Sequence, residues 1–201
     1  MPLSSVVGAQ SIVKPGVCTS STRPASPYEG QVIYETDTDL LRIWTGAAWR
    51  TLNAAAATNG SVLQVVNGTY STGVSTSVGG YSDTGLTATI TPSSTSSKIL
   101  VIVNQAGVQK SSGNAGNGVI IALLRGSTYL FFPATGAAYT GTAVQNIVSV
   151  GATFLDSPAT TSAVTYKTQF ANVIAAASVG VQISVGSGFP ESSMCLMEIS
   201  A

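Results

Sequence analysis

The chain has 201 residues, enough for one large hydrophobic core or for one core and a small additional module. Only 8% of the residues are charged, the formal net charge is zero, and there is no histidine. The eight lysines and arginines are scattered, so no basic stripe is present to bind a nucleic-acid backbone. The missing histidine removes the commonest general base and metal ligand, which excludes Ser-His and Cys-His catalytic pairs.

Low charge also predicts oligomerisation. An ordinary soluble domain is roughly 25% charged, and charge depletion is typical of surfaces buried between subunits. The apolar runs 99–103 and 119–124 are too short to cross a bilayer. The first residues lack the basic and apolar regions of a signal peptide. We therefore expect a self-associating protein that is made in the cytoplasm and does not insert into a membrane.

Residues 1–18 show no sustained periodicity and are predicted to form an N-terminal arm, which either docks on a neighbouring protein or frays. Residues 19–52 are predicted to form a small β-meander. A proline-rich entry is followed by short strand patterns at 30–37, 40–44 and 49–52, which turns containing glycine or aspartate separate. So small a module cannot bury enough surface alone. Tyr34, Trp44 and Trp49 must therefore pack on each other, on other subunits or on the next domain.

The remaining residues divide into an Ala-rich linker, 53–61, and a large β-domain, 62–201. The Ala run could form one helical turn. Beyond it, residues 86–90, 164–170 and 179–185 alternate apolar with polar side chains, whereas 98–103 and 119–124 are continuous apolar runs typical of strands buried on both faces. About eight or nine strands predict an antiparallel, jelly-roll-like β-sandwich. Cys18 and Cys195 predict no disulfide framework, and Cys195 is predicted to be a buried core side chain.

A distinctive pattern spans residues 21–49. It begins with Thr-Arg-Pro at 22–24, continues with Gly-Gln-Val-Ile-Tyr-Glu-Thr-Asp at 30–37, and ends with Leu41, Trp44, Gly46 and Trp49. This pattern resembles a module of bacteriophage virion proteins. Residues 85–101, 155–158, 165–167 and 196–199 resemble the domain that often follows it. The resemblance implies a virion location, a homotrimer, and contacts with other virion proteins through the N-terminal region. The corresponding attachment and interface candidates are Arg23, Pro24, Tyr34, Trp44 and Trp49.

Only three acidic residues cluster, namely Glu35, Asp37 and Asp39. Their carboxylates could bind a divalent cation, but the segment lacks the glycine and terminal glutamate of a calcium loop. We favour the alternative that Asp37 and Asp39 form local turn hydrogen bonds. Arg23 is predicted to pair with Glu29 or Glu35, and no cofactor is indicated.

Candidate receptor contacts lie in polar loops and at strand ends. Tyr70, Tyr81 and Tyr139 are surrounded by Gly, Ser and Thr, and Asn114 and Asn117 lie in a Gly/Asn/Ser loop at 111–118. Such residues suit contact with a host surface glycan or protein, although the loop could equally be a simple connector. Phe131 and Phe132 are predicted to be buried.

These features support a structural component of a bacteriophage virion, a short fibre or appendage that contributes to host attachment. The alternative is a capsid decoration protein that does not bind a receptor. A polysaccharide-degrading tailspike enzyme is disfavoured, because the sequence lacks histidine and spaced acidic pairs. We therefore expect no enzymatic activity.

Overall fold

The computed structural model describes residues 15–52, 59–188 and 190–201. All the regular secondary structure within these ranges consists of β-strands. The predicted all-β class is thus confirmed. The chain divides into two compact units, Met1–Ala56 and Ala57–Ala201. Within the described ranges, no helix is long and apolar enough to cross a membrane.

The first unit is a four-stranded sheet in the order β1-β2-β3-β4. The strands β2 (Val32–Glu35), β3 (Leu40–Trp44) and β4 (Trp49–Thr51) form the predicted antiparallel meander. The strand β1 (Gly16–Cys18) pairs parallel to β2. The predicted arm therefore ends earlier than residue 18, because its last residues hydrogen-bond to the meander. Residues 1–14 of that arm lie outside the described residues.

The second unit contains ten described strands in two sheets. Residues 53–58 of the predicted linker, including its Ala run, lie outside the described residues, whereas the Gly60 amide already donates to the Ser200 carbonyl. The strands are β5 (Val62–Tyr70), β6 (Val74–Thr76), β7 (Ser82–Ile90), β8 (Lys98–Lys110), β9 (Val119–Arg125), β10 (Thr128–Ala137), β11 (Asn146–Asp156), β12 (Val164–Asn172), β13 (Val179–Val181) and β14 (Ser192–Ile199).

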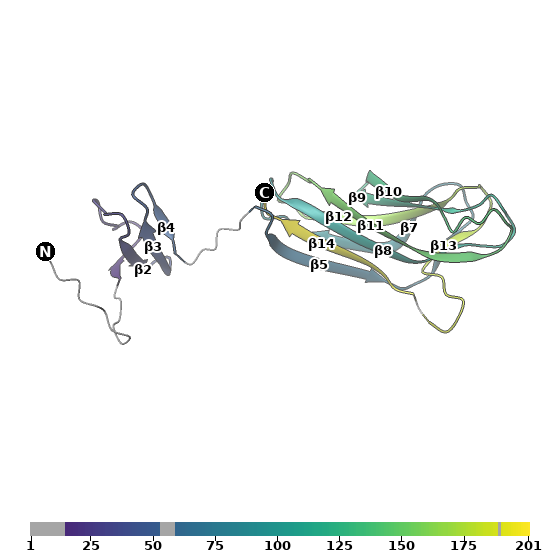
Figure 1. The fold of residues 1–201 in the computed structure, drawn as a ribbon, viewed down its shortest axis with the longest axis horizontal. Coiled ribbons are helices and arrows are strands. Elements are labelled where there is room, and N and C mark those ends of the chain that lie inside the picture. The colour runs from purple at the N-terminus through teal and green to yellow at the C-terminus, as the bar shows by residue number, and fades with distance from the viewer. Residues whose placement is uncertain (1–14, 53–58, 189) are drawn as a thin grey trace. The chain divides into compact units, whose positions relative to one another are not determined.

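The two sheets have the strand order of a jelly roll. One sheet runs β10-β9-β12-β7. The other runs β5-β14-β8, and β11 pairs along the opposite edge of β8. The short strand β13 pairs with the end of β8 at Gln109 and Lys110, and β6 pairs with β13. The chain crosses between sheets at most of its connections, and β5, β14 and β8 lie side by side (Figure 1). The predicted β-sandwich is confirmed.

Alternating apolar side chains build the core between the sheets. Leu86, Ala88 and Ile90 of β7 are buried, as their spacing of two predicts. They pack in one cluster with Val101 of β8 and Leu196 of β14. A second cluster surrounds Val108, Ile121 and Phe170.

The strand β8 corrects one prediction. Its residues 99–103 form a continuous apolar run, but only Ile99, Val101 and Val103 are buried, whereas Leu100 is half-buried and Ile102 is exposed. The outer face of this central strand has no covering layer from the sandwich itself. Continuous apolarity here therefore indicates a sheet face that the sandwich itself leaves uncovered.

Candidate binding surfaces

The N-terminal sheet is held by a buried carboxylate with two cationic partners. The Glu35 side chain is fully buried, and it accepts hydrogen bonds from Arg23 and, at 3.2 Å, from Nε of Arg42. Thr38 Oγ1 also donates to it at 2.8 Å. The Arg23 hydrogen bond, helped by Thr38 and Arg42, outweighs burial and lowers the pKa of Glu35 to about 2. The predicted Arg23–Glu35 pair is confirmed, but it is part-buried and internal to the module.

The three clustered carboxylates have separate partners. Asp37 accepts from the Ser20 hydroxyl at 2.5 Å and from the Ser20 amide at 2.8 Å, and these bonds lower its pKa. Asp39, at a positive φ of 59°, accepts from the Tyr34 hydroxyl. In the part of the chain that the structure describes, no three His, Cys, Asp or Glu side chains are placed to hold a metal ion. Asp37 and Asp39 therefore accept hydrogen bonds from other residues of this chain. Their partners, Ser20 and Tyr34, are farther away in sequence than the partners in the predicted turn hydrogen bonds.

The other N-terminal candidates are half-buried. The rings of Trp44 and Trp49, which are paired between β3 and β4, lie 5.5 Å apart at 59°. Pro24 and Tyr34 are also half-buried. The sequence allowed the tryptophans to pack on each other, on other subunits or on the next domain, and the structure shows the first of these contacts.

An aromatic cluster lies on the smaller sheet of the sandwich, β10-β9-β12-β7. Tyr81 precedes β7, and its ring centroid is 5.3 Å from Tyr129 and 6.2 Å from Phe132, both on β10. The Tyr129 and Phe132 rings are stacked 5.7 Å apart at 12°. The three side chains are 40%, 44% and 41% exposed, respectively. Tyr81 is therefore exposed as a receptor contact requires, whereas the predicted burial of Phe132 is wrong, because β10 is an edge strand with irregular register here.

Polar side chains continue this cluster across the sheet. The Tyr129 hydroxyl donates to Gln169 Oε1 at 2.9 Å, and Gln169 Nε2 donates to Asp83 Oδ1 at 2.8 Å. Lys167 forms an ion pair with Asp83 at 2.8 Å. The Lys167 hydrogen bond, with that of Gln169, lowers the pKa of Asp83 against the effect of its burial. Asp83 and Lys167 also line a hollow of about 190 Å³ with Gly85 and Thr87.

The remaining receptor candidates behave differently from one another. Tyr139 is exposed, and Lys110 Nζ lies 5.9 Å from its ring centroid. Asn114 is half-buried, accepts from the Gly116 amide at 2.9 Å, and lines a hollow of about 420 Å³. Asn117 is buried, and its amide group donates to the Ser178 carbonyl and accepts from the Ile174 amide.

Two of these predictions therefore change. Asn117 is buried and hydrogen-bonds to Ser178 and Ile174 in neighbouring segments, so it does not face solvent. Tyr70 packs against the core cluster with its ring close to Gly85, so it is a packing residue. Phe131 is 37% exposed, although its ring stacks on Phe154 at 6.0 Å, so its predicted burial is only partial.

The outer face of the larger sheet carries an apolar row that the sequence alone did not localise. Val65 of β5 pairs with Met197 of β14, Met197 pairs with Leu100 of β8, and Leu100 pairs with Leu155 of β11. Val65 and Leu155, at the two ends of the row, are 56% and 50% exposed. Sequence alternation in the four strands could have revealed the row only with the register known.

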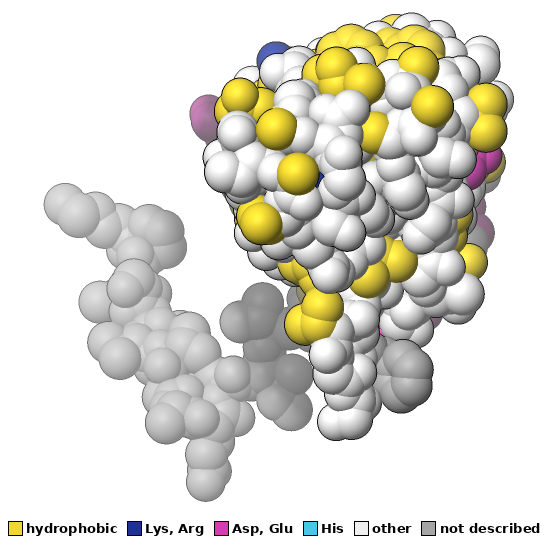
Figure 2. Space-filling model, turned by 90° about the vertical axis from the view of Figure 1, so that its right-hand side faces the viewer, with side chains coloured by type: hydrophobic (Ala, Val, Ile, Leu, Met, Phe, Trp, Pro, Cys, Tyr) yellow, Lys and Arg dark blue, Asp and Glu magenta, His cyan; other side chains and the backbone are white. Residues whose placement is uncertain are grey.

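The row beside it contains Cys195, which lies next to Ile102. Both cysteines are free and half-buried. The predicted core position of Cys195 is therefore wrong, because it points to the outer side of β14 with Met197. One face of the molecule illustrates the general surface character, with hydrophobic patches among uncharged side chains and few charged groups (Figure 2).

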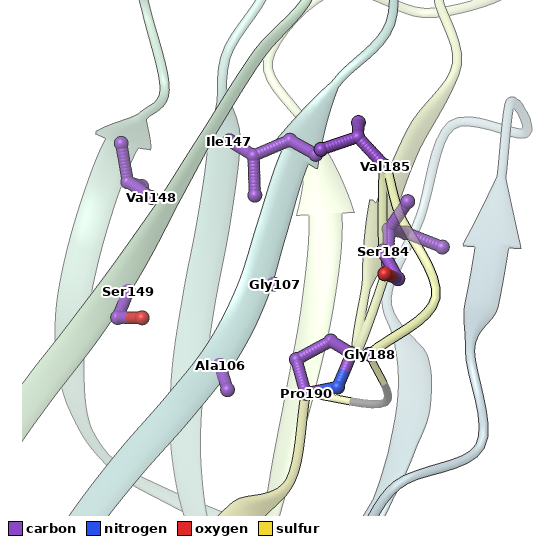
Figure 3. Close-up of a pocket in the computed structure, with 10 residues that line it drawn as sticks. Ala106, Gly107, Ile147, Val148, Ser149, Ser184, Val185, Gly188 and Pro190 are labelled. Atoms are coloured by element: carbon purple, nitrogen blue, oxygen red, sulfur yellow. The ribbon is translucent and has the colours of Figure 1, made fainter.

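One hollow beside β8 is lined by residues without catalytic side chains. It measures about 620 Å³ and lies between β8, β11 and the segment that follows β13, with Gly107, Ile147 and Val185 among its lining residues (Figure 3). Ser149 and Ser184 supply its polar side chains, and none of its lining residues is titratable. A general acid, base or metal ligand would need such a group.

Comparisons with known proteins give only distant structural similarity to this β-sandwich. No family model and no curated protein matches the chain. Among solved structures, it is similar to the VP2 subviral particle of infectious bursal disease virus, with 12% identity and a TM-score of 0.39 over 82% of this chain and 40% of that one. Similarity to the Gt strain structure of that virus is 12% with a TM-score of 0.37, covering 79% and 42% of the two chains.

A mutant VP2 of the same virus, in derived T=1 particles, gives 15% identity and a TM-score of 0.38 over 79% of this chain and 42% of that one. The chain thus spans about two fifths of the VP2 chains that it matches.

Proposed function

We propose that this chain is a non-enzymatic structural subunit of a bacteriophage virion, a short fibre or appendage that assembles as a homotrimer. The apolar row Val65–Met197–Leu100–Leu155 carries the proposal. Contiguous exposed apolar surface marks interaction sites in soluble proteins, and burying it stabilises an interface by roughly 25 cal/mol per Å². The row itself carries no charged side chain for a partner to complement. It therefore suits an apolar surface on a neighbouring copy of the chain, and such contacts around a threefold axis close into a trimer.

The virion location rests on the resemblance of residues 21–49 to the phage module. The structure supports that proposal in one respect: the residues shared with the module are those that hold its fold together. Arg23 and Glu35 form the part-buried ion pair, and Trp44 and Trp49 pack on each other. This N-terminal unit contacts other virion proteins, and the protein is made in the host cytoplasm before assembly.

The absence of enzymatic activity is supported by the engagement of the carboxylates. Glu35 forms ion pairs with Arg23 and Arg42, Asp156 binds Arg125 at 2.7 Å, and Glu198 accepts from Gln64 and Ser93. Glycosidases need one protonated and one free carboxyl group across a substrate cleft. These carboxylates are committed to structural hydrogen bonds.

Molar mass in solution tests the assembly. We expect light scattering to give three times the chain mass for the wild type and a single chain mass for Val65→Lys, because a lysine in the apolar row would be buried without a partner. Thr89→Lys, at an exposed position on the other sheet, is the control and should remain a trimer. A monomeric wild type at all attainable concentrations would disprove self-assembly.

The position on the particle separates the two virion roles. Antibody labelling of phage particles, viewed by electron microscopy, should mark the tail or a discrete appendage. Labels spread over the capsid faces would instead identify a decoration subunit that uses the same apolar row to contact its neighbours. Particles that carry no label would refute the virion assignment.

A further inference from the structure

We propose that the outer face of β7, β12, β9 and β10 binds a neutral oligosaccharide. The ligand stacks on Tyr81, Tyr129 and Phe132, and its hydroxyl groups bond to Gln169, Asp83 and Lys167. This inference deepens the proposed function, and its role in host attachment rests on that function.

The aromatic cluster supplies the stacking surface. Exposed large rings are usually isolated on a protein surface, whereas three here lie within 6.2 Å of one another. The nearly parallel rings of Tyr129 and Phe132 enclose an angle of 12°, and each ring is more than a third exposed. The carbon–hydrogen face of a pyranose is apolar and flat, so an exposed ring can desolvate it without leaving a hydroxyl group unpaired.

Buried side chains of β9 lie beside the rings in the sheet. Leu124 of β9 lies in register between Lys167 of β12 and Tyr129 of β10, and Ala122 pairs with Gln169. Both apolar side chains are buried, although they belong to the outer face. Rings and amides held by a sheet lose little conformational entropy on binding, which favours recognition of a weakly binding ligand.

The polar neighbours match the hydroxyl groups of a sugar. Gln169 is fixed at both ends of its amide, by Tyr129 and by Asp83. The Asp83 side chain is 58% exposed even with Lys167 bound to it, so its oxygens remain accessible to donors. The adjoining hollow of about 190 Å³ is smaller than the roughly 300–1,000 Å³ of pockets that enclose whole ligands, which suits one sugar unit of a longer chain.

The charge of this surface distinguishes a neutral sugar from other ligands. Lys167 is neutralised by Asp83, so no free cation is present in the cluster to bind phosphate or an acidic polymer. Protein interface cores are depleted of charge, whereas this surface sets an ion pair beside the rings. A surface with both stacking rings and an internally neutralised pair therefore favours a neutral saccharide.

Binding by the full-length chain tests the proposal. The probes are immobilised neutral oligosaccharides of glucose, galactose, mannose and N-acetylglucosamine, followed by calorimetric titration with the best-bound one. Tyr81→Ser and Phe132→Ser should each weaken binding at least tenfold. Tyr28→Ser, an exposed tyrosine of the N-terminal unit, should change it less than twofold.

Several results would overturn the inference. One is the absence of wild-type binding to every neutral glycan. Another is binding by both cluster variants that is as tight as that of the wild type. A third is loss of trimer mass in those variants, which would make the cluster a protein interface. Preferential binding of an anionic polymer would also count against it. The monomeric Val65→Lys variant keeps this sheet intact, so glycan binding by that variant separates this inference from the proposed assembly.

Discussion

At the scale of single residues, the N-terminal unit depends on one buried carboxylate. Glu35 is fully buried between Arg23 and Arg42, and Arg42 also donates to Thr51 of β4 at 2.7 Å. Among residues 15–52, the one other buried side chain is that of Ile33. A small module that lacks a large core can be specified by such a network, provided that both cations remain paired with the carboxylate.

Acid should therefore unfold this unit. Because folding lowers the pKa of Glu35 to about 2, the stabilisation is complete above the ordinary carboxyl pKa of about 4.3 and is lost as the pH falls toward 2. Both tryptophans of the chain, Trp44 and Trp49, lie in this unit. Their fluorescence should change over that pH window, whereas Glu35→Gln should weaken the unit at neutral pH and flatten the transition. An unchanged wild-type signal down to pH 2 would contradict this role.

Gly85 is required by both its conformation and its neighbour. Its φ is +87°, and a Cβ atom there would lie 2.3 Å from the Tyr70 ring. Gly85→Ala should lower the free energy of unfolding by about 2–5 kcal/mol, combining backbone strain with overpacking. Gly136→Ala is the control, because nothing lies within 4 Å of its added Cβ. Urea unfolding followed by circular dichroism measures both, and equal stability of the two variants would refute the packing of Tyr70.

The sequence predicted residue roles well where the partners were local or charged. The Arg23–Glu35 pair was predictable, because few charges are available in the module. Tyr70 and Asn117 were not, since their burial depends on segments distant in sequence: Tyr70 meets Gly85 on β7, and Asn117 meets Ser178. Phe132 was missed because register irregularity on an edge strand turns it outward.

At the scale of strands, a polar network crosses the sandwich interior. Thr168 of β12 donates to Gln105 of β8 at 2.9 Å, and Gln105 donates to Ser192 of β14 at the same distance. Thr84 and Gln182 extend the network at its two ends. Such buried bonds fix the relative placement of the two sheets, because a sliding strand would leave the groups unpaired.

Removing the central member of this network should be costly. Gln105→Ala leaves buried hydroxyl groups on Thr168 and Ser192 without their amide partner and creates a cavity, so we expect a loss of about 2–4 kcal/mol in unfolding free energy. Asn104→Ala, at the exposed neighbouring position, should change stability by less than about 0.5 kcal/mol. Chemical denaturation compares the pair. A Gln105 variant as stable as the control would show that the network contributes nothing.

Strand patterns gave the fold class and most strand positions, but not the outer faces. Alternation in β7 and β12 predicted the core side correctly, because a half-buried strand has only one apolar face. The apolar run in β8 was compatible with a strand that other elements bury on both faces. Which face remains uncovered depends on strand order, and that order places β14, from the C-terminal end of the second unit, between β8 and β5.

At the scale of the whole molecule, the proposed tasks fall on separate surfaces. The apolar row is on the outer side of the larger sheet, and the aromatic cluster is on the outer side of the smaller one. Because the two outer faces of a sandwich point in opposite directions, a subunit can associate through one and bind a ligand through the other. The low charge of the chain is consistent with extensive burial of surface in such an assembly.

The reactivity of Cys195 tests self-assembly most directly, because this thiol lies in the row beside Met197 and Leu100. With Cys18→Ser removing the other thiol, its reaction rate with a maleimide is measured over a hundredfold range of protein concentration. The account predicts slow reaction when trimers are populated and fast reaction on dilution, with Val65→Lys fast throughout. A rate that is equally fast at all concentrations, in a sample whose mass is trimeric, would contradict burial of this face.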